Sequence, residues 1–395
     1  ERLKKDPSLD LRLVPSIIGG DEQSRHGVVL AKSISAKKFG VRTGEPVASA
    51  LRKCPSLLIE RPDHKLYSRR SRELMQLLHE YTSDIEQVSI DECYMAYSPI
   101  AHRFPSAISG AHTIADHIKN SLGFTVNIGI APNKLLAKMA SDFEKPDKIH
   151  TLFPKEIPEK MWPLPVSELF MVGHSSADRL LQLGIRTIGE LAGCSPEFLQ
   201  QHFKSHGKLM WEYANGIDDS PLNSISHELK GIGNSTTLSA DALTASEAKK
   251  VLLRLAEQVA SRLRKAHQIT QTVAVEIKYS TFQTCSRQTQ LSTPNASSKS
   301  LYECACRLFD ELWNGTPVRL LGIRTSKLLP EDTPVQLSLF DESFTLRRED
   351  SDKQKKLDQA VDEIRRRFGD RAVIRGSLLQ TEEKTRRNPQ YTEHS

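Results

Sequence analysis

Apolar residues recur at helical spacing in several long segments of the chain. A period of three to four residues predicts amphipathic helices at 45–53, 63–81, 107–121, 132–143, 245–267, 301–313 and 355–368. Short alternating or continuous apolar runs predict strands at 28–31, 57–59, 124–130, 273–279 and 285–291. Residues 1–20 and 223–240 are rich in Pro, Gly or Ser, so we expect irregular structure and a polar linker there. This alternation of helices and strands predicts an α+β fold with several domains.

Two adjacent carboxylates interrupt the apolar stretch Gln87–Tyr97. In a straight strand, neighbouring side chains point to opposite faces. Asp91 and Glu92 can therefore hold one ion together only at a strand end or in a tight bend. Two solvated acids on a half-buried strand are the ordinary outcome for such a pair, because charged residues are mostly exposed. The local pattern leaves both interpretations open.

The length and composition limit the class of protein. A chain of 395 residues is too long for one hydrophobic core, so we expect about two to four domains. An apolar content of 38% with 26% charged residues is typical of a soluble globular protein. The sequence has no apolar run long enough for a membrane span, so we expect no membrane partner. The six cysteines include no C-x-x-C pair, which favours a reduced, cytoplasmic setting.

The charge is distributed unevenly along the chain. The net charge is +6, but residues 1–70 and 223–330 are basic, whereas residues 71–222 are acidic. Basic surfaces favour phosphate backbones, and an acidic centre favours a divalent metal. Many basic surfaces are merely solvated, so the charge alone does not decide between these possibilities.

Residues 172–191 form a second candidate site. Capping signals begin short helices at Ser175 and Thr187, and Leu183–Ile185 supplies a glycine turn between them. Such a helix-hairpin-helix exposes backbone N–H groups that can bind a DNA phosphate without reading a base. A plain pair of antiparallel helices fits the same pattern.

Four blocks together resemble the Y-family translesion DNA polymerases, and they are most similar to the bacterial UmuC/DinB type. They follow the family's order: Ala36–Gly44, Val88–Tyr94, Asn127–Asp142 continuing to Lys145-Pro146, and 172–191. The likeness extends over about residues 9–380, and its order and spacing make it specific.

The resemblance implies a right-hand polymerase with five regions. They are the fingers with part of the palm at 1–65, the palm at 66–155, the helix-hairpin-helix thumb at 156–222, a small α+β little finger at 228–330, and a C-terminal region at 331–395. The last region would hold a clamp-binding peptide, a helix and a disordered tail.

The resemblance also implies error-prone, template-directed addition of dNTPs to a primer 3′-hydroxyl, in DNA repair, damage tolerance and the SOS response. In such enzymes the palm carboxylates hold two Mg²⁺ ions. Asp91 matches the acid that bridges the metals, and Glu92 matches the ligand of the catalytic metal. Lys145 matches a lysine that contacts the incoming triphosphate.

Some family positions are altered in this chain. Lys37 takes the place of the usual fingers arginine, which keeps the charge but loses the bidentate fork. Ile34 lies where many members have a triphosphate-binding tyrosine. In the thumb, the predicted DNA contacts are Gly173, Gly184, Ile185 and Thr187.

The family's first strand carries a third metal-binding Asp followed by an aromatic steric gate. The sequence starts at Glu1, and Asp6 and Asp10 lie in a Pro-interrupted segment and are poor substitutes. We therefore expect an N-terminally incomplete chain that polymerises poorly or not at all as written.

A hydrophobic peptide follows Pro330 and resembles the segment by which bacterial polymerases bind the β sliding clamp. Leu337, Leu339 and Phe340 would fill an apolar pocket while Gln336 bonds at its rim, with Ser338 between them. An ordinary strand is the alternative. The expected partners are primer-template DNA, dNTPs and the clamp, and the expected state is a monomer.

Two other functions fit part of the sequence. A catalytically impaired DNA- and clamp-binding accessory protein would fit the incomplete metal site. A helix-hairpin-helix nuclease or glycosylase would fit 172–191, but it leaves the blocks at 88–94 and 127–146 unexplained.

Overall fold

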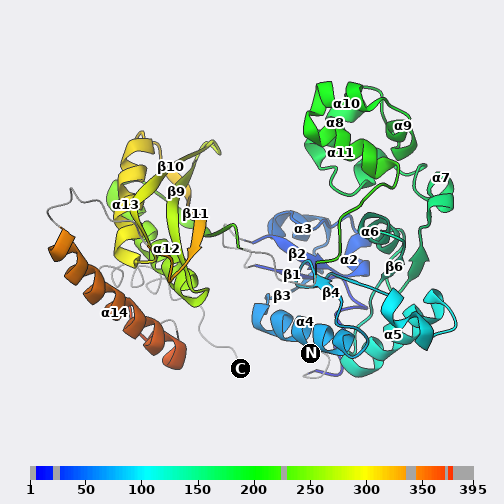
Figure 1. Ribbon diagram of the computed structural model, residues 1–395, viewed down its shortest axis with the longest axis horizontal. Coiled ribbons are helices and arrows are strands. Elements are labelled where there is room, and N and C mark those ends of the chain that lie inside the picture. The colour runs from blue at the N-terminus through cyan, green and yellow to red at the C-terminus, as the bar shows by residue number, and fades with distance from the viewer. Residues whose placement is uncertain (1–5, 21–26, 224–228, 335–343, 370–371, 377–395) are drawn as a thin grey trace. The chain divides into compact units, whose positions relative to one another are not determined.

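The computed structural model (Figure 1) describes residues 6–20, 27–223, 229–334, 344–369 and 372–376, with the backbone alone for 344–352. The chain divides into two compact units. One unit combines residues 1–62 with 228–395, and the other comprises residues 63–227. Within the described ranges, no helix is both long and apolar enough to cross a bilayer.

A three-stranded sheet organises residues 16–60. Its elements are β1 (Ser16–Gly19), β2 (Val29–Lys32), α2 (Ile34–Lys38), α3 (Val47–Lys53) and β3 (Leu58–Glu60). The strand order is β2-β1-β3, with β1 antiparallel to β2 and parallel to β3. The prediction of irregular structure at 1–20 is therefore wrong for β1. The strand is too short to show a period, and pairing on both sides with burial of Ile17 stabilises it.

The second unit begins with an α+β segment. In chain order its elements are α4 (His64–His79), β4 (Ile85–Gln87), β5 (Cys93–Met95), η1 (Ser98–Arg103), α5 (Ala107–Leu122), β6 (Ile128–Ile130), α6 (Lys134–Asp142) and β7 (Ile149–Thr151). Apolar faces of α4 and α5 share a core with Ile85 of β4. The expected strand at 124–130 is shorter and only half-buried, because β6 pairs with β7 alone in its sheet. The next helix starts at Lys134 rather than Pro132, since Asn133 is its N-cap.

Short helices complete this unit. They are η2 (Pro154–Glu156), α7 (Ile157–Lys160), η3 (Val166–Glu168), α8 (His174–Gln182), α9 (Ile188–Ala192), α10 (Pro196–Phe203) and α11 (Ser205–Ala214). Their core also includes Leu135, Leu136 and Met139 of α6. One hydrophobic core thus extends across residue 155, where we placed the palm–thumb boundary. The buried face of α6 thus packs in the same core as the helices of the hairpin.

Residues 231–330 form a four-stranded antiparallel sheet with two helices against one face (Figure 1). The elements are β8 (Gly231–Ala242), α12 (Ala245–Lys265), β9 (Gln268–Tyr279), β10 (Thr284–Asn295), α13 (Ser298–Leu312) and β11 (Val318–Pro330), in the sheet order β10-β9-β11-β8. The polar linker expected at 223–240 is wrong, because residues 231–240 belong to β8. Glycine, serine and threonine hide this edge strand from an apolar pattern, and pairing with β11 decides its conformation.

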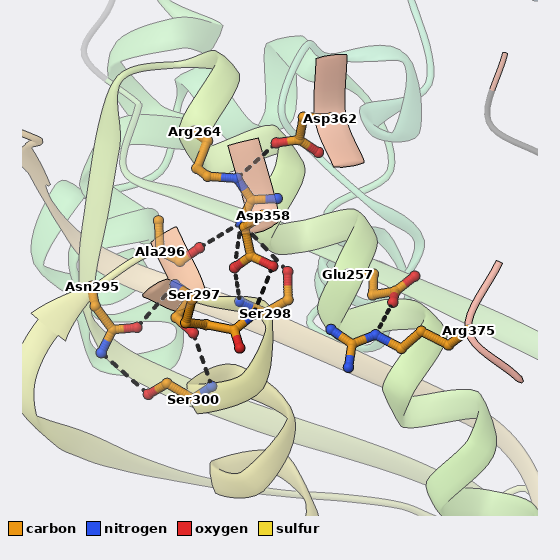
Figure 2. Close-up of polar contacts among 11 residues, drawn as sticks. Glu257, Arg264, Asn295, Ala296, Ser297, Ser298, Ser300, Asp358, Asp362 and Arg375 are labelled. Carbon is orange, nitrogen blue, oxygen red and sulfur yellow. Dashed lines mark hydrogen bonds and ion pairs between the residues drawn. The ribbon is translucent and has the colours of Figure 1, made fainter. Parts of the chain in front are cut away.

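A C-terminal helix, α14 (Phe344–Phe368), joins this module through charged side chains (Figure 2). The carboxylate of Asp358 accepts a hydrogen bond from the backbone N–H of Ser298 at 3.0 Å, at the start of α13. Arg264 of α12 bonds Asp362 at 2.7 Å and lies 3.4 Å from Asp358. Asp358 is only 4% exposed, so these hydrogen bonds replace the contacts with water that its side chain loses on burial.

Phe309 is fully buried among the strands and helices of residues 231–330. We expect Phe309→Ala to lower the free energy of unfolding of this module by about 3–5 kcal/mol, because it removes a ring from a closed core. Hydrogen exchange of the amides of β9 and α13 measures this change. Leu243→Ala, at a side chain that is 65% exposed, is the control and should stay within about 0.5 kcal/mol.

Candidate active site

The two adjacent acids lie in a tight turn between β4 and β5. The strands pair antiparallel, with Gln87 opposite Cys93. The backbone carbonyl of Glu92 then accepts the N–H groups of Val88 at 3.0 Å and of Ser89 at 3.2 Å, which closes the turn. Residues 88–92 are therefore not a continuous strand. The geometry is the tight bend that a joint ion site for the two carboxylates requires.

Ser89 fixes the conformation of this turn. Its hydroxyl oxygen accepts the N–H groups of Asp91 at 3.3 Å and Glu92 at 3.1 Å, and the hydroxyl donates to Oδ1 of Asp91 at 2.8 Å. Gln87 supports the turn from the strand, because its side-chain amide donates to the Ser89 carbonyl at 2.9 Å and to Ser71 on α4 at 3.1 Å. The carboxylates are thus held on a turn that is itself braced against a helix.

Both acids are exposed, whereas Glu86 in the adjoining strand is buried. Glu86 accepts Nζ of Lys134 at 3.0 Å and the backbone N–H of Asn223 at 2.8 Å. A carboxylate with such partners has a structural role. The exposed pair at Asp91 and Glu92 remains accessible to a ligand from solution.

A line of alternating charges runs from the turn along α6. Oε1 of Glu92 lies 2.5 Å from Nζ of Lys138, and the same ammonium lies 3.2 Å from Oδ2 of Asp142. Oδ1 of Asp142 lies 2.6 Å from Nζ of Lys145. Lys145 is thus linked to Glu92 indirectly, through Lys138 and Asp142, and its role at the triphosphate stays a prediction. Sequence reasoning missed Lys138 and Asp142, although their i,i+4 spacing on a helix predicts an ion pair.

The pairing favours the charged forms of Lys138 and Asp142. Burial opposes the charge on Lys138, but hydrogen bonds to Glu92 and Asp142 raise its pKa overall. Burial would raise the pKa of Asp142, but the ammonium groups of Lys145 and Lys138 lower it overall. In β5, directly after the two acids, burial raises the pKa of Cys93 to about 11 and that of Tyr94 to about 12. These two side chains are therefore neutral, and the carboxylates and ammonium groups carry the local charge.

The donor set suits a hard divalent cation. Within the described ranges, no group of three or more His, Cys, Asp or Glu side chains is arranged to hold a metal. Mg²⁺, however, is commonly bound by one or two carboxylates together with waters and substrate phosphates. Asp91 and Glu92 supply two such carboxylates. The ion pair between Glu92 and Lys138 shows that a positive charge can lie beside this carboxylate. The residues present therefore fit Mg²⁺ when waters or phosphate oxygens complete the coordination.

Lys37, the other predicted triphosphate contact, lies in the first unit. It is an exposed residue in the last turn of α2, a helix that begins at the Ser33 cap. Its exposure is compatible with phosphate binding. Its role stays a prediction.

The hairpin expected at 172–191 is present. Its first helix, α8, begins after Gly173 as N-cap and not at Ser175. Gly184 has φ +84°, a conformation that side chains with a Cβ rarely adopt, and Thr187 forms the predicted capping box with Glu190.

The N–H groups of this turn already have acceptors within the protein. Those of Gly184 and Ile185 each donate to a carbonyl of α8 at 3.0 Å, and that of Thr187 donates to Glu190 at 3.2 Å. A DNA phosphate at the turn would therefore have to share these donors, and the predicted contacts remain untested. The predicted clamp-binding residues Gln336–Phe340 lie outside the described residues.

Comparison with known proteins identifies the family. The model of the impB/mucB/samB family matches residues 2–142, and that of the family's C-terminal domain matches residues 229–339. DNA polymerase IV of Clostridium acetobutylicum is 46% identical over 384 residues, which cover 97% of this chain and 95% of that protein. DNA polymerase IV of Acetivibrio thermocellus is 37% identical over 94% of this chain and 92% of that protein.

A solved structure supports the same assignment at the level of the fold. A Y-family DNA polymerase chimera of Dbh and Dpo4 matches with a TM-score of 0.72, over 83% of this chain and 95% of that chain, at 23% identity. This match confirms the predicted α+β multidomain polymerase fold. The chain belongs to the impB/mucB/samB family, as a Y-family DNA polymerase of the DinB/UmuC type.

Proposed function

We propose that the chain is an error-prone translesion DNA polymerase that adds dNTPs to a primer 3′-hydroxyl as a template directs. The observation that carries this proposal is the turn between β4 and β5. It exposes Asp91 and Glu92 to solvent, and ion pairs through Lys138 and Asp142 of α6 link Glu92 to Lys145. Paired carboxylates near fixed ammonium groups suit phosphoryl transfer, which depends on positioning and on charge stabilisation.

Y-family polymerases depend on divalent metal in general, and two Mg²⁺ ions are our proposal for this chain. Asp91 and Glu92 would hold them. When bound, Mg²⁺ supplies Lewis-acid chemistry that lowers the pKa of the primer hydroxyl and neutralises charge on the triphosphate. Lys145 and Lys37 would bind the triphosphate oxygens.

DNA and clamp contacts belong to the regions outside the palm. We assign the fingers with part of the palm to residues 1–65, the palm to 66–155, the thumb to 156–222 and the little finger to 228–330. The thumb hairpin, through Gly173, Gly184, Ile185 and Thr187, would contact the DNA backbone. Residues 336–340 would bind the β sliding clamp, and the chain would act as a cytoplasmic monomer.

The second candidate is a DNA- and clamp-binding accessory protein with little catalysis of its own. The observation that favours it is that the turn offers two carboxylates, and that the described residues contain no group of three or more His, Cys, Asp or Glu side chains that could hold a metal. Such a protein would bind primer-template DNA and the clamp without incorporating dNTPs.

The first test removes one carboxylate charge at a time. We expect Asp91→Asn and Glu92→Gln each to lower Mg²⁺-dependent primer extension by at least about a hundredfold, because even the loss of a residue that only orients a metal ligand costs up to that much. Gel-based extension of a labelled primer by the purified chain measures the effect. Asp116→Asn, at an exposed acid of α5, is the control and should keep wild-type activity. Full extension by either site variant would remove the catalytic assignment, and an inactive wild-type chain that still binds DNA would favour the accessory protein.

The second test concerns the clamp. We expect Leu339→Ala combined with Phe340→Ala to weaken binding to the purified β clamp by about thirtyfold or more, because apolar anchors in a pocket carry most of the energy of such a contact. Surface plasmon resonance measures the affinity. Extension of a short primer without clamp should be unchanged. Asp332→Asn, at an exposed residue upstream of the peptide, is the control, and equal clamp binding by all three proteins would contradict the assignment.

A further inference from the structure

Lys138 is the most enclosed member of the line of charges from Glu92 to Lys145. Its side chain is 18% exposed, compared with 48% for Glu92, 44% for Asp142 and 54% for Lys145. Packing holds its helix in place, because the neighbouring Leu135 and Met139 of α6 are buried in the core of residues 135–214. The ammonium of Lys138 is therefore held beside Glu92 by a packed helix, unlike a surface lysine on a free stem.

The contacts of Lys138 and Asp142, the two middle residues of the line, indicate a different role for each. The ammonium of Lys138 forms ion pairs with two carboxylates, those of Glu92 and Asp142. Asp142 gives each of its two oxygens to a different lysine, so it fixes the separation of Lys138 and Lys145. Changing either middle residue would disturb the groups at both ends of the line.

We propose that Lys138 and Asp142 are positioning residues of the polymerase site, an inference that rests on the function proposed above. Lys138 is a built-in counter-cation, which orients Glu92 before metal binds and then competes with the metal for that carboxylate. Asp142 aims the ammonium of Lys145 at the triphosphate. Neither residue needs to contact the reacting atoms.

The proposal predicts opposite effects on two ligands when Lys138 loses its charge. A metal at Glu92 no longer meets a neighbouring ammonium, so it should bind more tightly. A triphosphate loses one nearby positive charge, so it should bind more weakly. A purely structural ion pair on the helix surface predicts neither change, since such pairs contribute little beyond local stability.

The prediction for Asp142 separates aiming from simple charge. Asp142→Asn keeps the shape and removes a negative charge near the triphosphate site. Charge alone would strengthen nucleotide binding and leave the rate of incorporation intact. Loss of aiming would lower the rate instead, because small errors in position are costly for phosphoryl transfer.

The metal arm uses Mn²⁺ titrations followed by electron paramagnetic resonance, without DNA or nucleotide. We expect Lys138→Met to bind Mn²⁺ about threefold more tightly than wild type, as for an ion pair that is partly exposed. Lys138→Arg should restore the wild-type affinity. Lys148→Met is the matched control, since it removes the same charge from an exposed lysine outside the line. Unchanged or weaker Mn²⁺ binding by Lys138→Met, with a wild-type melting temperature, would overturn the role of Lys138.

The nucleotide arm uses single-turnover incorporation with varied dNTP. We expect Lys138→Met to raise the Kd for dNTP by about threefold. We expect Asp142→Asn to lower the maximal rate by about tenfold while its Kd stays near the wild-type value. A wild-type rate in Asp142→Asn would overturn the aiming role. If the wild-type chain extends no primer, the proposed function itself fails, and the Mn²⁺ titration still decides whether Lys138 opposes a metal at Glu92.

Discussion

The site depends on one short turn whose conformation is set by a serine hydroxyl. The Ser89 hydroxyl bonds to the backbone N–H groups of both acids and to the carboxylate of Asp91, while the carbonyl of Glu92 closes the turn by accepting the N–H groups of Val88 and Ser89. A straight strand would have placed the two carboxylates on opposite faces. In the turn both residues are exposed, and this accessibility makes a shared cation site physically reasonable.

Helix α6 of the second unit supplies the side chain that pairs with Glu92. Helix α6 buries one face in the core that it shares with the short helices of residues 157–214, and it presents Lys138 and Asp142 from another face. The shared core means that the position of these charges depends on packing well beyond the palm segment. A substitution in this core would shift α6, and with it Lys138 and Asp142, without changing a charged residue.

Buried charge has a different role in the module of residues 231–330. Asp358 and Glu257 are almost fully enclosed. Arg264 bonds to Asp358 and Arg375 bonds to Glu257 (Figure 2), and Arg365 of α14 also bonds to Glu257. Such pairs give little net stability, but an unmatched partner is costly, so they select one arrangement of α14. At the turn between β4 and β5, by contrast, Asp91 and Glu92 are exposed to solvent. This exposure suits the binding of a ligand, whereas the buried pairs hold α14 in place.

The sequence by itself determined most helices, the order of the family blocks and the identity of the acidic pair. Long amphipathic periods and capping residues such as Thr187 act locally, so they can be read without the fold. The strands β1 and β8 could not be predicted, because they are short or polar and pairing with distant strands decides them. Tertiary structure also decided that residues 88–92 turn and that Lys138 meets Glu92, since a contact across 46 residues has no local signature.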